Sequence, residues 1–133
     1  MTDFHPHGGT SIEMRGRMLV FRSQANMNGE EVARLQRETV ERIRGLAGKP
    51  WAILGVVETA VLLTADAEAA AKAALPQMAA LGLTAQAVVF LDPAERPLVE
   101  AQATRIVDDT IPMRFFDRAA DAEAWLSSMI GAD

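Results

Sequence analysis

Two nearly continuous apolar segments, residues 51–57 and 85–91, constrain the fold of this chain more than any other feature. Their sequences are WAILGVV and AQAVVFL. Short apolar runs of this kind are typical of buried strands in a parallel sheet. Between them, Thr64 precedes an alanine-rich segment with acidic residues in its first turn, which predicts a helix that ends near Gly82. The pattern predicts a strand, a helix and a second strand that belong to one buried sheet.

The N-terminal part of the chain predicts a hairpin followed by a helix. Residues 11–15 alternate between apolar and polar side chains, Gly16 permits a tight turn, and residues 18–21 predict a second strand. Asn28 and Glu31 then form a capping-box pattern. Apolar residues recur at helical spacing after this pair, which predicts a helix before the next strand.

The C-terminal part predicts a helix, a short strand and a final helix. Asp92 and the proline after it start a helix whose regular part is expected over about residues 97–107. Residues 111–116 predict a short strand, which Pro112 restricts to a sheet edge or to its first position. Asp117 is expected to cap the final helix, which carries an apolar stripe at helical spacing.

Together these segments predict an α/β fold with the element order ββαβαβαβα. We expect a mixed sheet of about five strands with an N-terminal hairpin, and about four helices packed on it. Residues 1–9 show no period and contain two adjacent glycines, so a flexible tail is expected there, and residues 10–133 are expected to form one domain. Pro76 lies inside the alanine-rich helix, where its missing N–H predicts a kink or a break.

Composition narrows the classes of function. The chain has 133 residues, of which 50% are hydrophobic, and this is enough for one domain with a core. A formal net charge of −5 argues against a general nucleic-acid-binding protein. The absence of cysteine excludes disulfides, a thiolate nucleophile and cysteine-ligated metal sites. No apolar run is long enough to span a bilayer and no signal peptide is visible, so we expect a cytoplasmic protein.

The sequence predicts no catalytic or cofactor-binding motif. His5 and His7, the two histidines, fall in the expected tail, so neither a metal site nor a serine–histidine hydrolase is predicted. Glycine-rich phosphate-binding motifs are absent. Adjacent carboxylates such as Asp108 and Asp109 are better explained as solvated helix ends. We expect a protein that is not an enzyme and has no cofactor, since an enzyme would have to use the carboxylate of Glu58 as a base with no evident helper.

Four residues are candidates for contacts with a ligand or a partner. Glu58 and Thr59 follow the first buried strand, and Thr64 opens the next helix. Ligands of open α/β sheets bind beyond the carboxyl ends of the strands. Pro76 is the fourth candidate, because a bend there would move its helix away from the sheet and leave room. The alternative for Thr64 is a purely structural role as a helix cap.

The order and spacing of several segments resemble the bacterial SpoIIAA-like proteins, a group related to STAS and SEC14 (CRAL-TRIO) domains. Residues 113–126 carry most of the resemblance, with a strand that ends in Phe-Phe and an acidic helix that contains Ala124-Trp125-Leu126. Gly16-Arg17 between two strands and Trp51 at the start of a buried strand also fit. The resemblance covers most of the chain. It implies an α/β fold that is used for regulation or for binding apolar ligands.

The function that this resemblance implies is a non-catalytic module that binds an apolar small molecule or a partner protein in a regulatory role. We expect the site between the sheet and the helical segments 65–81 and 98–107, where alanine leaves room. The alternative is a phosphorylation-controlled partner switch of the anti-sigma-factor antagonist type. The Asp-Ser-x-Gly segment of such switches is absent, so Thr59 or Thr64 would have to replace the phosphorylated serine. The sequence leaves a homodimer open.

Overall fold

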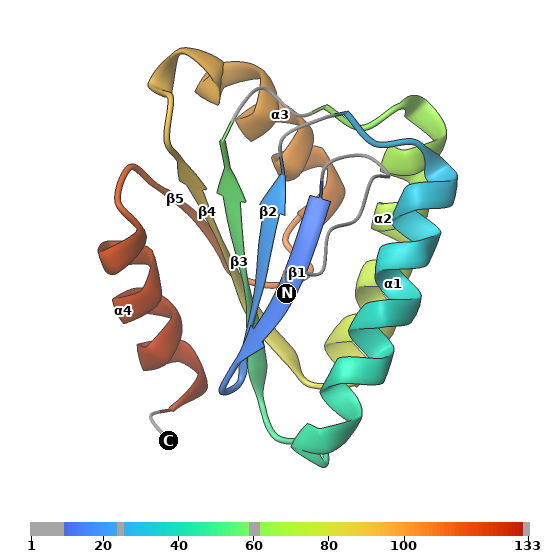
Figure 1. Cartoon of the computed structure of the whole chain (residues 1–133), viewed down its shortest axis with the longest axis vertical. Helices are drawn as coiled ribbons and strands as arrows, with labels where there is room; N and C mark the ends of the chain where they lie inside the picture. Colours follow the sequence, from blue (N-terminus) through green and yellow to red (C-terminus); the bar gives the residue numbers. More distant parts are fainter. Residues whose placement is uncertain (1–9, 24–25, 59–61, 132–133) are drawn as a thin grey trace, which may run out of the picture.

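The computed structural model of the chain describes residues 10–23, 26–58 and 62–131 (Figure 1). Its strands are β1 (Thr10–Arg15), β2 (Met18–Ser23), β3 (Trp51–Val57), β4 (Leu83–Phe90) and β5 (Met113–Phe116). Its helices are α1 (Gly29–Ile43), α2 (Ala65–Ala80), α3 (Arg96–Val107) and α4 (Ala119–Ile130). Short 3₁₀ turns at Arg44–Leu46 and Pro93–Glu95 follow α1 and precede α3. The predicted element order is confirmed, and the expected tail lies outside the described residues.

The five strands form one mixed sheet in the order β1-β2-β3-β4-β5. β1 and β2 are antiparallel, and the pair Arg15 and Met18 closes a two-residue turn in which Gly16 has a φ of +60°. Glycine adopts this conformation without a steric penalty, as the predicted hairpin requires. β2, β3, β4 and β5 are parallel to one another. β3 is the middle strand, and β5 lies at an edge, as Pro112 led us to expect.

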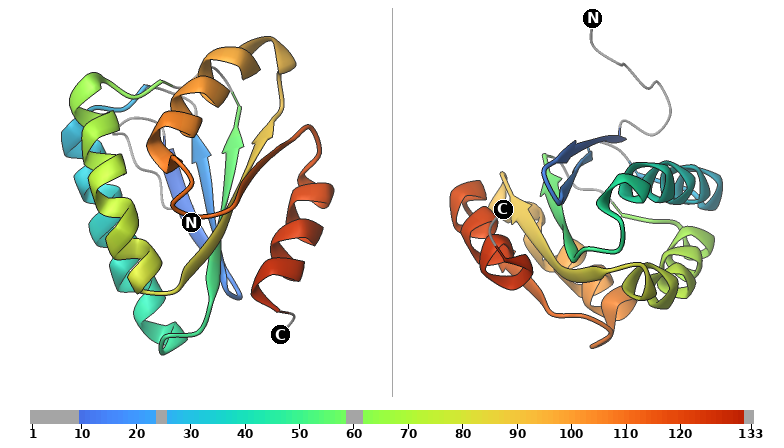
Figure 2. Two further views of the ribbon diagram at one scale, coloured as in Figure 1. Left: turned by 180° about the vertical axis from the view of Figure 1, so that it is seen from behind. Right: turned by 90° about the horizontal axis from the view of Figure 1, so that it is seen from below.

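Helices cover the two faces of the sheet in different ways (Figure 2). On one face, α4 packs directly against β3, β4 and β5. Its fully buried side chains Ala122 and Leu126 join Leu54 and Val89 in one hydrophobic cluster. On the other face, α1 packs against α2 and α2 packs against α3. These three helices contact one another more than they contact the strands, and this leaves space above the sheet.

Trp51 connects the start of β3 to the end of α2. Its side chain is fully buried, and its Nε1 donates a hydrogen bond of 2.9 Å to the carbonyl oxygen of Leu81. Gly82 follows with a φ of +108°, and a Cβ atom there would lie 2.9 Å from the carbonyl oxygen of Lys49. The helix ends at Gly82 as predicted. A glycine is required at this position both by the backbone conformation and by the lack of space for a side chain.

Two local predictions need correction. The break expected as one of two outcomes at Pro76 does not occur, since α2 runs continuously through this residue. The backbone bond that proline removes concerns the carbonyl of the exposed Lys72, which water can satisfy. Asp117 does not cap α4, since Arg118 is the capping residue and makes no side-chain bond to the helix. The carboxylate of Asp117 instead accepts a hydrogen bond of 2.9 Å from Arg96 on α3.

Candidate functional site

A cavity of about 240 Å³ lies between the sheet and helices α1, α2 and α3. Side chains of β2, β3 and β4 form its floor, and all three helices contribute to its walls, with residues such as Leu35, Leu75 and Ile106. Protein interiors contain few voids larger than a water molecule. A cavity is thus present at the place where the sequence predicted an apolar site, between the sheet and the segments 65–81 and 98–107.

The floor of the cavity contains a glycine in the middle of the central strand. Ile53 and Gly55 line the cavity, and both are only partly buried although strands lie on both sides of β3. A Cβ atom added to Gly55 would meet only the carbonyl oxygen of Ala87, at 3.8 Å. The space over Gly55 is therefore open, because neither a neighbouring strand nor a helix fills it.

The lining of the cavity is mainly apolar. Among the described residues that form it, none is acidic, basic or histidine. The polar ones are Ser23, Gln36, Thr39, Gln86 and Gln102. Thr39 donates a hydrogen bond of 2.8 Å to the carbonyl oxygen of Leu35, and Gln36 donates one of 3.3 Å to the carbonyl oxygen of Ala70. These bonds hold the walls together within α1 and between α1 and α2.

Gln102 of α3 binds Leu63, a lining residue that lies just before α2. Its side-chain oxygen accepts a hydrogen bond of 2.8 Å from the backbone N–H of Leu63, and its Nε2 donates to the carbonyl oxygen of Leu63 at 3.0 Å. Nε2 also donates to Glu68 at 2.9 Å. Leu63 in turn forms a parallel bridge with Met27, which precedes α1. The residues that precede α1 and α2 are thereby joined through Met27 and Leu63.

An ion pair joins α2 and α3 beside the hydrogen bonds of Gln102. Arg105 donates to both carboxylate oxygens of Glu68, at 2.9 and 3.2 Å. The hydrogen bonds from Arg105, and next the one from Gln102, lower the pKa of Glu68 from 4.5 to about 2. Glu68 is therefore ionised at neutral pH, and its role is to hold two helices of the cavity wall together.

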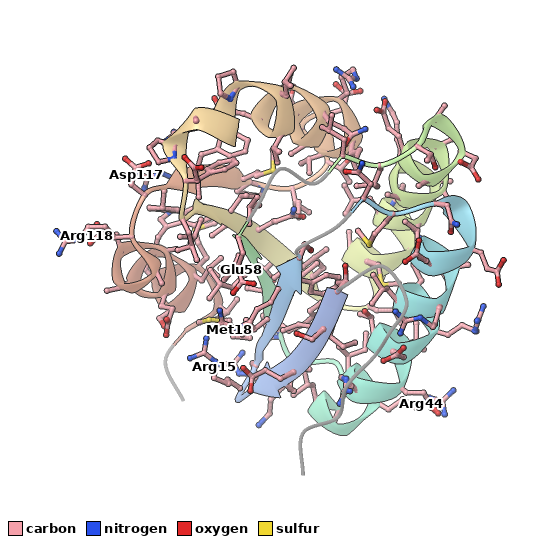
Figure 3. The ribbon with its side chains drawn as sticks, turned by 45° about the horizontal axis from the view of Figure 1, so that its top comes forward. Arg15, Met18, Arg44, Glu58, Asp117 and Arg118 are labelled. Atoms are coloured by element: carbon pink, nitrogen blue, oxygen red, sulfur yellow. The ribbon has the colours of Figure 1, made fainter. Side chains whose placement is uncertain are left out.

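The three sequence-predicted site residues that the structure describes, Glu58, Thr64 and Pro76, lie outside the cavity lining. Glu58 follows β3, and its carboxylate lies 3.5 Å from Arg22 in an ion pair. Figure 3 labels Glu58 at this end of the sheet. Because side chains alternate along a strand, Arg22 shares the α4 face with Val20, and the ion pair lies opposite the cavity. Thr59 lies outside the described residues.

Thr64 is the N-cap of α2 and Pro76 lies within this helix, so the two residues are about 18 Å apart along its axis. Thr64 caps the helix, because its hydroxyl oxygen accepts a hydrogen bond from the N–H of Ala67 at 3.4 Å. The same hydroxyl donates to Asp66, and this bond lowers the pKa of the Asp66 carboxyl. The structural interpretation of Thr64 as a cap is confirmed. Pro76 is exposed on α2.

Sequence reasoning did not single out Gly55 and Gln86, which the structure places on the cavity floor. Both interrupt the apolar runs that predicted the buried strands. A glycine or a glutamine in a strand that is otherwise apolar was the available signal. Its meaning depended on which face of the sheet lacks a closely packed helix, and the sequence alone does not reveal this.

In the part of the chain that the structure describes, no group of three or more histidine or acidic side chains could hold a metal ion. No helix within the described residues is long and apolar enough to cross a membrane.

Comparison with solved structures identifies the fold. The structure is similar to that of an uncharacterized protein of the DUF3478 family from Shewanella loihica PV-4, which has a SpoIIAA-like fold. The TM-score is 0.61, and the match covers 95% of this chain and 99% of that chain. This protein has a SpoIIAA-like fold. The sequence identity is 16%, so the likeness establishes the fold alone. No family model and no curated protein matches the sequence.

The SpoIIAA-like fold agrees with the resemblance inferred from the order and spacing of the sequence segments. The match spans the hairpin, the three parallel strands after it and the final helix, since it covers nearly the whole chain. Fold alone is a weak guide to function, because one fold hosts many activities. The function must therefore be argued from the cavity.

Proposed function

We propose that this protein is a non-catalytic module that binds a small apolar molecule in the cavity between the sheet and helices α1 to α3. The observation that carries the proposal is the open apolar space over Gly55. A glycine in a strand interior costs about 0.5–1 kcal/mol relative to alanine. Neither a positive φ nor a crowded neighbour explains why residue 55 is glycine. A ligand that occupies the space over it would explain the glycine.

The size of the cavity indicates the size of the ligand. A cavity of about 150 Å³ takes up benzene, and pockets for drug-sized ligands measure about 300–1,000 Å³. The volume of about 240 Å³ lies between these values. A molecule with about two fused rings, or a short aliphatic chain, fits this range. The resemblance to SEC14 domains supports the same class, because that fold binds apolar ligands.

The surroundings of Thr64 favour ligand binding over the alternative of a phosphorylation switch. The hydroxyl of Thr64 is engaged with Asp66 and with the backbone of α2. A phosphate on this oxygen would remove the donated bond and place negative charge beside the Asp66 carboxylate. Thr59 and Thr64 remain sequence predictions for that alternative, and a regulatory partner protein remains the expectation if no ligand binds.

The proposal is tested with the purified full chain and a cavity-filling variant. Native mass spectrometry followed by denaturing extraction should reveal a co-purifying apolar molecule, and added naphthalene should bind to the emptied protein. Gly55→Leu should lower naphthalene affinity at least tenfold, because the new side chain fills the space that the probe occupies. The variant should be at least as stable as the natural protein, since an added Cβ atom meets no clash and the leucine side chain buries apolar surface in the cavity.

Gly45→Leu is the matched control, because Gly45 is exposed and has nothing within 4 Å of an added Cβ atom. It should bind naphthalene as the natural protein does. Unchanged binding in Gly55→Leu would show that the probe occupies another place. Absence of both a co-purifying molecule and naphthalene binding would contradict the proposal and favour a partner protein.

A further inference from the structure

The polar groups on the cavity floor specify the ligand further, and this inference rests on the proposed function. No charged side chain is among the described residues that line the cavity. An ionised carboxylate or amine that enters such a space loses its hydration and gains no counter-charge. The cavity therefore disfavours fatty acids, phosphate esters and amines as ligands.

Gln86 stands out among the polar lining residues. It lies in β4 between two buried alanines, and it faces the cavity beside Ile53, its partner in the β3 register. Its backbone N–H donates to the carbonyl oxygen of Pro112 at 3.0 Å. Its side-chain amide, in contrast, forms no hydrogen bond with any described residue. A central strand thus presents an amide with both donors and acceptors to an otherwise apolar space.

Ser23 is a second lining residue whose hydroxyl has no hydrogen bond among the described residues, but it stands at the end of β2. It pairs with Val57, whereas Gln86 pairs with Ile53, four residues earlier on β3. The two positions are therefore about 13 Å apart along the strands. One polar group of a small ligand can reach only one of them. Gln86 is the one beside the open space over Gly55.

We propose that the cavity binds an uncharged ligand whose hydroxyl or carbonyl group forms a hydrogen bond with the side-chain amide of Gln86. Gly55 and Val88 pair two residues further along the same strands, about 7 Å away. The apolar part of the ligand lies over this pair. A pure hydrocarbon would displace water from the amide of Gln86 and leave it without a partner, so a ligand with one matching polar group binds more tightly.

Three probes that share one ring system separate these cases: naphthalene, 2-naphthol, which is uncharged at pH 7, and 2-naphthoate, which is charged. We expect 2-naphthol to bind about tenfold more tightly than naphthalene, and 2-naphthoate to bind at least about a hundredfold more weakly than 2-naphthol. Binding is followed by ¹H–¹⁵N NMR. The side-chain amide signal of Gln86, identified by its loss in a variant, should shift with 2-naphthol.

Gln86→Leu is the variant that tests the hydrogen bond. It keeps the side chain at a similar size and should lower the affinity for 2-naphthol about tenfold, to the level of naphthalene, while naphthalene binding is retained. Gln77→Leu is the matched control, because Gln77 is exposed on α2 and lies outside this cavity. It should leave the affinities of all three probes unchanged.

The outcomes distinguish this inference from the proposed function. If naphthalene and 2-naphthol bind equally and Gln86→Leu changes neither, the role of Gln86 is wrong, and binding in the cavity stands. Tightest binding of 2-naphthoate would also overturn the inference. If no probe binds up to its solubility limit, the inference is wrong, and if no apolar molecule co-purifies either, the proposed function is wrong as well.

Discussion

At the scale of single residues, two glycines lack a side chain for opposite reasons. Gly82 has a φ of +108° and is crowded by Lys49 and by the ring of Trp51. Gly55 has an ordinary strand conformation, and a Cβ atom there would meet only one atom within 4 Å, at van der Waals distance. Gly82 is therefore explained by folding, and Gly55 is explained by the space that it leaves open.

This difference leads to a prediction about Gly82. Gly82→Ala should lower the free energy of unfolding by about 3 kcal/mol, because backbone strain adds to a clash with Lys49 and Trp51. Gly48→Ala is the control, since Gly48 has a φ of +81° but open space around it, and should cost only about 1–2 kcal/mol. Urea unfolding followed by tryptophan fluorescence measures both. Equal losses would show that crowding at Gly82 contributes nothing.

Helix caps show which residues sequence analysis can place. Asn28 accepts a hydrogen bond from the N–H of Glu31, and Thr64 accepts one from the N–H of Ala67, as their local patterns predict. Asp117 has the same capping chemistry but binds Arg96, 21 residues earlier in the chain. A cap within one turn depends on neighbouring residues, whereas a competing partner depends on the tertiary fold. Gln86 escaped prediction for the same reason.

At the scale of elements, a polar clasp holds α2 and α3 together over the cavity. The bonds between Glu68 and Arg105 are its main part, and Lys72 lies 3.5 Å from Asp108 at the end of α3. Asp108 and Asp109 have φ values of +43° and +63°, so α3 ends before them at Val107. The helix end that the adjacent carboxylates predicted is thus confirmed, and one of these side chains joins the clasp.

The clasp predicts how stability depends on pH. Arg105 and Gln102 lower the pKa of Glu68 from 4.5 to about 2 in the folded protein. The stabilisation is therefore complete above pH 4.5 and is lost as the pH falls through about 2. Glu68→Gln should be less stable than the natural protein at pH 7, and this difference should shrink between pH 4.5 and 2. Urea unfolding at several pH values measures the difference.

A double-mutant cycle provides the control for this prediction. Arg105→Gln removes the main cause of the lowered pKa, so adding Glu68→Gln to it should change stability little at any pH. A difference between Glu68→Gln and the natural protein that stays constant from pH 7 to pH 2 would show that the carboxylate charge does not stabilise the clasp. The ion pair between Glu68 and Arg105 thus links two helices that form the cavity wall.

At the scale of the whole molecule, the two faces of the sheet are packed for different purposes. The order ββαβαβαβα could be predicted because alternation, apolar runs and caps each depend on short stretches of sequence. The packing of helices on the two faces could not be predicted, because α2 and α4 are both rich in alanine and yet pack differently. In α4, Ala122 lets the helix contact the sheet closely. In α2, Ala74 lines the cavity and leaves it open.

The same substitution on both faces tests this difference. Ala122→Leu should lower the free energy of unfolding by about 1–3 kcal/mol, because Ala122 is fully buried and added methyl groups must displace closely packed atoms. Ala74→Leu should be neutral or stabilising by up to about 1 kcal/mol, since its side chain enters existing space. Intrinsic helix propensity differs little between alanine and leucine and affects both variants alike. Urea unfolding measures both changes.

The effects of the two substitutions on ligand binding should be the reverse of their effects on stability. Ala74→Leu should weaken naphthalene binding although it does not weaken the fold, whereas Ala122→Leu should weaken the fold and leave the affinity of the folded protein unchanged. A similar loss of stability in both variants would mean that α2 is packed against the sheet as closely as α4 is. In that case the space over Gly55 would be filled in solution, and the ligand site would have to lie elsewhere.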